Sequence, residues 1–203
     1  EFYEMDASTS VSNAWETLTY DFSGAPAYNY DRLVVFFDHG NTIANYTSGR
    51  IKTQNLYDFK YGRVEVRAKL PASAGTWPAI WMLGSNFPTV GWPQCGEIDI
   101  MEQKGDDKNT VLGTCHWLDT TSSSNASFGE TTAVLNGASE FHLYTVEWTD
   151  TAIKIYLDDA PYYELTNNAS LPFNADFFLI LNVAMGGSLG GTVEGAFTED
   201  TME

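Results

Sequence analysis

Three carboxylates lie within one short stretch of the chain: Glu97, Asp99 and Glu102. The residues between them are all apolar, which favours a β-strand over a loop. Two carboxyl groups held on a rigid element can cleave a glycosidic bond, one as the nucleophile and the other as the general acid. The spacing therefore points to acid-assisted glycoside hydrolysis. A solvated acidic edge and a calcium site are the alternatives that spacing alone leaves open.

The parity of a strand sets a condition on this chemistry. Side chains alternate between the two faces of a strand, so Glu97 and Asp99 share one face and Glu102 points to the other. A one-residue β-bulge near Met101 would return Glu102 to the face of the other two acids. Glu97 is then the candidate nucleophile and Glu102 the candidate acid/base. Asp99 can hydrogen-bond to Glu97 and raise the pKa of a neighbouring carboxyl group by like-charge repulsion.

The elements that must position these acids read as strands. Short alternating or apolar runs recur along the chain, separated by Gly, Pro, Asn and Asp, and helical periodicity is absent over any long stretch. Two such runs, residues 143–148 and residues 153–157, flank a short polar turn at residues 149–151 and predict a β-hairpin. This pattern predicts an all-β sandwich. The other expected strands are residues 17–22, 33–37, 63–70, 111–117 and 177–183.

Composition narrows the partners. The formal net charge of −17 disfavours nucleic acid and strongly sulfated polysaccharides, and it is compatible with a neutral glycan. No apolar run is long enough to span a membrane. The first residues have no basic n-region and no apolar h-region, so a secretion signal is expected to be absent, removed or never included. Of the two cysteines, Cys95 is predicted to face the side of the acids and Cys115 the opposite side, so free thiols are expected.

The segment GEIDIME, residues 96–102, resembles the active-site signature of glycoside hydrolase family 16. It has the form with an extra residue before the last Glu, which is typical of laminarinase-like members. The resemblance extends over about residues 44–203 and implies a concanavalin-like β-jelly-roll with an open cleft. It also implies retaining endo-hydrolysis of a laminarin-type β-1,3-glucan, with Glu97 as nucleophile, Asp99 as helper and Glu102 as acid/base. The flanking segments that look like family segments, in family order, are residues 46–51, 61–67, 75–83, 91–93, 141–148 and 181–187.

The resemblance also bears on domain organisation. Residues 1–42 look like the tail of a carbohydrate-binding module, and residues 43–203 look like the catalytic domain. The usual amino-terminal strands and the closing strand of the family are not visible, so a jelly-roll incomplete at both ends is expected. No catalytic metal or other cofactor is implied, although some members carry a structural calcium. A secreted or periplasmic monomer is expected.

Four further residues are candidates for substrate binding. By resemblance, Trp92 stacks on a sugar ring, and a core position is the alternative. Trp77 follows Gly75-Thr76 and could reach the cleft, whereas Trp81 fits the core as well as the cleft. His116 could hydrogen-bond to Asp99 or to a sugar hydroxyl group, although a lone histidine is more often structural.

Three alternatives to a β-1,3-glucanase stay open on the sequence. The same mechanism could act on mixed-linkage glucan or on an agarose-type galactan, because the acid motif does not select the glycan. The chain could instead be a non-catalytic glycan-binding sandwich or an inactive fragment. Retention of all three acids favours the enzyme over the binding protein.

Overall fold

The computed structural model describes residues 46–193, 195 and 197–203. The strands predicted at residues 17–22 and 33–37, and the whole segment 1–42, lie outside the described residues. The described part consists of β-strands with two single-turn helices. The elements are β1 (Gly49–Lys52), β2 (Gly62–Ala68), β3 (Thr76–Gly84), α1 (Phe87–Val90), β4 (Glu97–Gln103), β5 (Thr110–Asp119), β6 (Ser124–Ala133), β7 (His142–Trp148), β8 (Ala152–Leu157), β9 (Ala160–Thr166), β10 (Phe177–Met185) and α2 (Gly187–Gly190).

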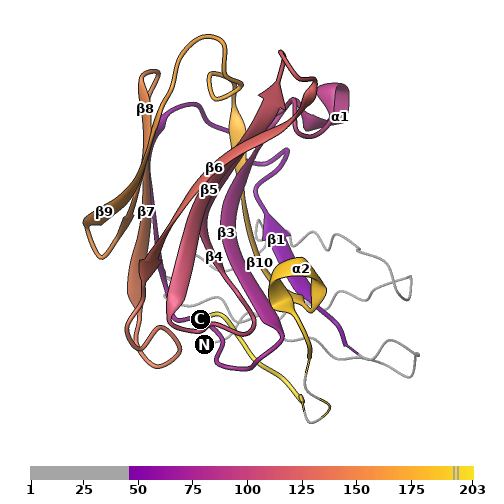
Figure 1. The fold of residues 1–203 in the computed structure, drawn as a ribbon, viewed down its shortest axis with the longest axis vertical. Coiled ribbons are helices and arrows are strands. Elements are labelled where there is room, and N and C mark those ends of the chain that lie inside the picture. Colours follow the sequence, from indigo (N-terminus) through magenta and orange to yellow (C-terminus); the bar gives the residue numbers. More distant parts are fainter. Residues whose placement is uncertain (1–45, 194, 196) are drawn as a thin grey trace.

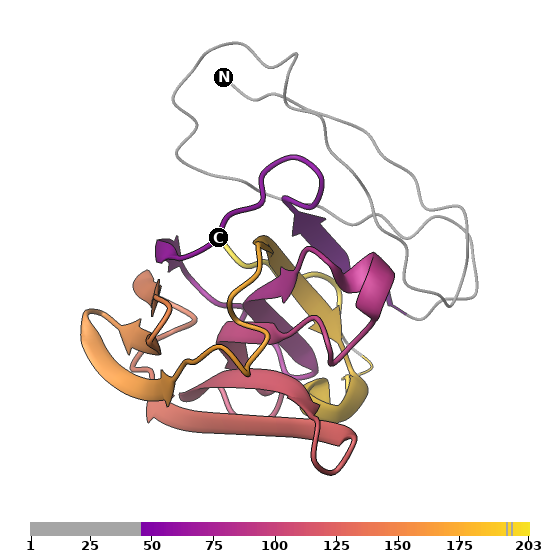
Figure 2. The same ribbon diagram turned by 90° about the horizontal axis from the view of Figure 1, so that it is seen from above.

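The strands form two antiparallel sheets that pack face to face (Figure 1). The six-stranded sheet has the order β1-β10-β3-β4-β5-β6, and the four-stranded sheet has the order β2-β7-β8-β9. Viewed from above, the larger sheet runs across the molecule from indigo β1 to red β5 and β6 (Figure 2). The predicted all-β jelly-roll sandwich is confirmed. So is the hairpin, in which Trp148 of β7 pairs with Ile153 of β8.

The hydrophobic core lies between the two sheets. Ile80 and Ile98 of the large sheet are fully buried there, as are Ile153 and Ile155 of the small sheet. Because neighbours on a strand point to opposite faces, burying Ile98 turns Glu97 and Asp99 to the outer face of the large sheet. Fixing the core thus fixes the side of the sheet on which the acids lie.

The two cysteines pack on opposite sides of the large sheet. Cys115 belongs to the main core between the sheets, whereas Cys95 packs with Leu83, Phe178 and Ile180 in a smaller cluster. Both are buried and free, which confirms the expectation from strand parity. Burial raises the pKa of the Cys95 thiol to about 11 and raises that of Cys115 further. Neither thiol is therefore poised as a nucleophile.

The described residues contain no helix with the length and apolar character that crossing a bilayer requires.

Candidate active site

Strand β4, which carries the three acids, departs from regular pairing at its centre. Against β3, the consecutive residues Ile80 and Trp81 pair with Met101 and Asp99, so Ile100 is an extra residue on β4. Against β5, the register also shifts between Asp99 and Glu102. Two residues opposite one define a β-bulge, and the bulge predicted near Met101 is confirmed.

The bulge returns the third acid to the outer face. Ile100 and Met101 are both fully buried in the main core, so the alternation of faces is interrupted once. The Tyr162 hydroxyl donates a hydrogen bond to the Ile100 carbonyl oxygen at 3.2 Å. Glu102 then pairs with Ala79 of β3 and lies on the same side as Glu97. The core takes both apolar residues because burying them is favourable, and this burial sets the direction of Glu102.

Glu97 opens β4 directly after a glycine that no other residue could replace without strain. Gly96 has φ +79°, and a Cβ atom there would lie 2.9 Å from Pro172 Cγ and 3.0 Å from Phe177 Cζ. The Glu97 side chain accepts a hydrogen bond at Oε2 from Trp92 Nε1, at 3.0 Å. Trp92 is 45% exposed, so its ring lies at the surface beside the acid. Sugar stacking by Trp92 stays a prediction.

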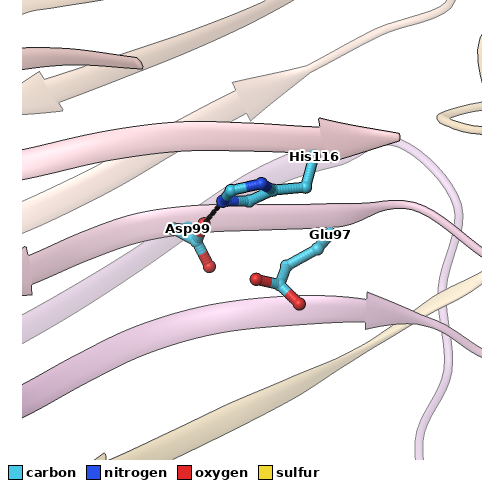
Figure 3. Close-up of side chains that lie close together, drawn as sticks. All are labelled: Glu97, Asp99 and His116. Atoms are coloured by element: carbon cyan, nitrogen blue, oxygen red, sulfur yellow. Dashed lines mark ion pairs between the residues drawn. The ribbon is translucent and has the colours of Figure 1, made fainter. Parts of the chain in front are cut away.

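Asp99 is the most deeply buried of the three acids, at 3% exposure. Its Oδ2 atom lies 3.4 Å from His116 Nε2, and Figure 3 shows the imidazole of β5 reaching over to Asp99 beside the Glu97 carboxyl group. In the sheet, His116 pairs with Glu97. His116 therefore lies beside Asp99, as the sequence allowed, but within ion-pair distance and without the predicted hydrogen bond.

Glu102 is held by the second tryptophan. Trp77 Nε1 donates a hydrogen bond to Glu102 Oε1 at 2.9 Å. Trp77 lies at the start of β3, two positions before Ala79, and therefore on the outer face that Glu102 shares. Trp77 was predicted to be able to reach the cleft, and it contacts Glu102 through this hydrogen bond. Its role in substrate binding stays a prediction.

Trp81 also lies on the outer face and not in the main core. Its Nε1 donates to Asn182 Oδ1 of β10 at 2.7 Å, and the Arg50 guanidinium carbon lies 5.9 Å from its ring centroid. Asn182 pairs with Arg50 of β1, so the two form a polar row beside Trp81. Neither was singled out in the sequence. Asn182 had a weak signal, as a polar residue inside an otherwise apolar strand.

The site raises the pKa of all three acids, mainly because burial removes water from the charged forms. The pKa of Glu97 rises to about 8, and Asp99 adds to the effect by repulsion. The pKa of Asp99 rises well above its usual range, with Glu102 as the second cause. Three acids this close share their protons, so at neutral pH the site carries fewer than three negative charges. An ionised nucleophile next to a protonated acid is the state that glycoside cleavage requires.

These shifts predict that the acids destabilise the fold as the pH rises. A carboxyl group with a raised folded pKa binds more protons in the folded state, so stability is lost from the unfolded pKa upward to the folded one. For Glu97 this window runs from about 4.5 to about 8. We expect Glu97→Gln to raise the free energy of unfolding by about 2 to 5 kcal/mol at pH 8 and by almost nothing at pH 4. Denaturant titrations at both pH values measure the difference.

The matched control is Glu164→Gln on the exposed surface of β9. This substitution removes the ion pair between the Glu164 carboxylate and the Lys154 ammonium group, which lie 3.2 Å apart. Its effect should stay below about 1 kcal/mol at either pH, because exposed pairs contribute little. An equal change for Glu97→Gln at pH 4 and pH 8 would contradict a burial penalty on its charge.

One group of described residues has the geometry to hold a metal ion. Glu97, Asp99 and His116 offer ligand atoms that all lie within 4.8 Å of one another. The imidazole makes calcium a poor fit, because calcium takes oxygen ligands. The absence of a catalytic metal stays a prediction.

Several known proteins are similar to the chain. The Beta-glucanase of Rhodothermus marinus is 39% identical over 157 residues, which is 72% of this chain and 55% of that protein. Glucan endo-1,3-beta-glucosidase A1 of Niallia circulans is 37% identical over 166 residues, or 74% and 24% of the two chains. Thus the chain spans about half or less of the length of these relatives. A LamA variant of Zobellia galactanivorans, solved with laminaritriose and laminaritetraose, matches with a TM-score of 0.69 and 46% identity, over 72% of this chain and 64% of that one.

A family model extends the similarity over most of the sequence. The model of glycosyl hydrolases family 16 matches residues 17–201. It begins within the segment 1–42, for which the tail of a binding module was predicted, and that assignment stays a prediction. On this match, the chain belongs to glycosyl hydrolase family 16.

Proposed function

We propose that the chain is the catalytic part of a retaining endo-β-1,3-glucanase. Glu97 is the nucleophile, Glu102 the acid/base and Asp99 the group that tunes both. The observation that carries the proposal is the bulge at Ile100, which puts Glu102 on the same face as Glu97. Without it, the two glutamates would lie on opposite sides of the sheet and could not act on one bond.

In the first step, a Glu97 oxygen forms a bond to the anomeric carbon while the glycosidic C–O bond breaks. Glu102 gives its proton to the departing oxygen, so the leaving sugar departs as a neutral alcohol. In the second step, Glu102 accepts a proton from water, and the water oxygen attacks the anomeric carbon and displaces Glu97. Two inversions at the same carbon retain its β configuration. Burial raises the pKa of Glu102, which favours the protonated form that the first step requires.

Support for the substrate comes from charge and from the relatives. A net charge of −17 suits a neutral glucan. One relative is named as acting on β-1,3-linkages, and the solved LamA variant binds laminari-oligosaccharides. Mixed-linkage glucan is a second candidate, because two further relatives are named as endo-1,3-1,4-beta-glycanases. Such polymers are too large to cross a membrane, so we place the enzyme outside the cytoplasm. We also propose that it acts as a monomer.

The test is to incubate the purified protein with laminarin, lichenan and agarose and to measure reducing ends. We expect release from laminarin, with oligosaccharides of several lengths as early products. Proton NMR of the first products should show the β anomer before mutarotation. Binding of laminarin without release would support the glycan-binding alternative. Neither release nor cooperative unfolding would support the inactive fragment.

We expect that removal of metal ions leaves the activity on laminarin within about twofold, because the steps above need only carboxyl groups. Dialysis against EDTA followed by the reducing-end assay measures this. Added Zn²⁺ should inhibit, since Glu97, Asp99 and His116 can bind it in competition with their proton and substrate roles. Loss of activity after EDTA and its return with a metal would overturn the metal-free scheme.

A further inference from the structure

Each of the two catalytic glutamates accepts a hydrogen bond from one indole N–H group. Trp92 donates to Glu97 Oε2 at 3.0 Å, and Trp77 donates to Glu102 Oε1 at 2.9 Å. The two tryptophans come from different places, one from the segment that precedes β4 and the other from the start of β3. A stacking role alone does not require either N–H to point at a carboxyl group.

An indole is a donor and never an acceptor, so each contact marks one oxygen of its carboxyl group. The carbonyl oxygen of a protonated carboxyl group is its better acceptor, so the Trp77 N–H at Glu102 Oε1 favours Oε2 as the oxygen that carries the proton to be transferred. At Glu97, the Trp92 N–H draws charge onto Oε2, which leaves Oε1 as the more nucleophilic oxygen and favours its attack on the anomeric carbon. The two indoles thus distinguish the two oxygens of both acids.

The contacts also bear on ionisation. A donor to a carboxyl oxygen favours the charged form, and both indoles lower the pKa of their partner against the effect of burial. For Glu97 this favours the ionised nucleophile. For Glu102 it limits how far burial raises the pKa, so the acid can still give up its proton.

The two rings are fixed to different degrees. Trp77 is half-buried and lies against α2, where a Cβ on Gly187 would be 3.4 Å from its Cζ3 atom. Trp92 is 45% exposed, and its ring centroid lies 6.1 Å from that of His116. Trp77 is thus held by packing, whereas Trp92 remains accessible to a sugar ring while it holds Glu97.

We propose that Trp92 and Trp77 are positioning residues, whose indole N–H groups select the attacking oxygen of Glu97 and the proton-bearing oxygen of Glu102. This proposal rests on the proposed function for its catalytic meaning, but the hydrogen bonds can be tested without activity.

The kinetic test replaces each tryptophan by phenylalanine, which keeps an aromatic ring and removes the donor. We expect Trp92→Phe to lower kcat on laminarin roughly 10- to 100-fold, the usual range for a hydrogen bond to a charged group. KM should change by less than about threefold. The acidic limb of the pH profile should move to higher pH, because the ionised nucleophile has lost its donor. For Trp77→Phe the basic limb should move to higher pH, because Glu102 then holds its proton longer.

The matched control is Trp81→Phe, whose N–H points to Asn182 and not to an acid. It should leave both limbs of the pH profile in place, whatever its effect on KM. Thermal unfolding of all three variants checks that each is folded. A change in KM alone for Trp92→Phe, with unmoved limbs, would reduce Trp92 to a stacking residue and overturn the proposal.

The activity-independent test is NMR of the wild-type protein labelled with ¹⁵N at the indoles. The Nε1–H resonances of Trp92 and Trp77, assigned from the phenylalanine variants, should shift as the acids titrate, and that of Trp81 should not. Glu97→Gln should abolish the titration at Trp92. If the Nε1–H resonances of Trp92 and Trp77 did not shift with pH, the proposal would be overturned even if the enzyme were active. Resonances that titrate in a protein that cleaves no glycan would support the contacts and contradict only the proposed function.

Discussion

Glu97→Gln should lower the rate of laminarin cleavage by more than about 10³-fold, because the amide cannot form the covalent bond to the anomeric carbon. Gln is close to Glu in shape and can still accept the hydrogen bond from Trp92, so the site should keep its form. Reducing-end release at saturating laminarin gives the effect on kcat. Binding of laminari-oligosaccharides by calorimetry should stay within a few fold of the wild type.

Chemical rescue assigns the role of Glu97. In Glu97→Ala the space left by the carboxyl group can admit azide, which attacks the anomeric carbon directly. The product expected with an activated aryl glycoside is the α-glycosyl azide, because only one inversion occurs. A β-glycosyl azide would show that another residue is the nucleophile. Glu164→Gln on the exposed surface of β9 is the matched control and should retain full activity.

Glu102→Gln should lower cleavage of laminarin by about 10²- to 10⁴-fold, the usual contribution of general acid–base catalysis. The loss should depend on the leaving group. Departure of a sugar alcohol needs the proton of Glu102, whereas departure of dinitrophenolate does not. Formation of the glycosyl-enzyme from a dinitrophenyl laminaribioside should therefore remain fast in the variant, and its hydrolysis should be slow.

A pre-steady-state burst of dinitrophenolate would show that the glycosyl-enzyme of the Glu102→Gln variant forms quickly and is hydrolysed slowly. Azide should accelerate turnover of Glu102→Ala and give the β-glycosyl azide, because here the azide replaces water in the second step. Equal losses on laminarin and on the dinitrophenyl substrate would contradict the acid/base role. The basic limb of the wild-type profile should vanish in Glu102→Gln, since the group whose ionisation causes it is gone.

Much of the acid strand was accessible from the sequence, because the relevant physics is local. Alternation of side chains is a property of any strand, so the spacing of Glu97, Asp99 and Glu102 showed that a bulge was needed if the two glutamates were to share a face. The two consecutive apolar residues Ile100 and Met101 make this bulge favourable, since both can be buried in the core. The hairpin at residues 149–151 and the opposed thiols follow from the same kind of short-range argument.

The indole contacts were not accessible in this way. Trp77 and Glu102 are 25 residues apart, and their hydrogen bond depends on the register between β3 and β4. That register is set by the bulge and by the packing of both strands on the small sheet, neither of which a sequence pattern measures. The same holds for Trp81 and Asn182, which are 101 residues apart.

The sequence by itself thus determined which carboxyl groups are present, and it predicted that they lie on a strand that must kink if the two glutamates are to act together, because these points depend on residue type and on a period of two. Only the tertiary structure decided which neighbour each acid meets. The reason is physical: strand order and register follow from burying one shared core, a property of the whole chain and not of any segment.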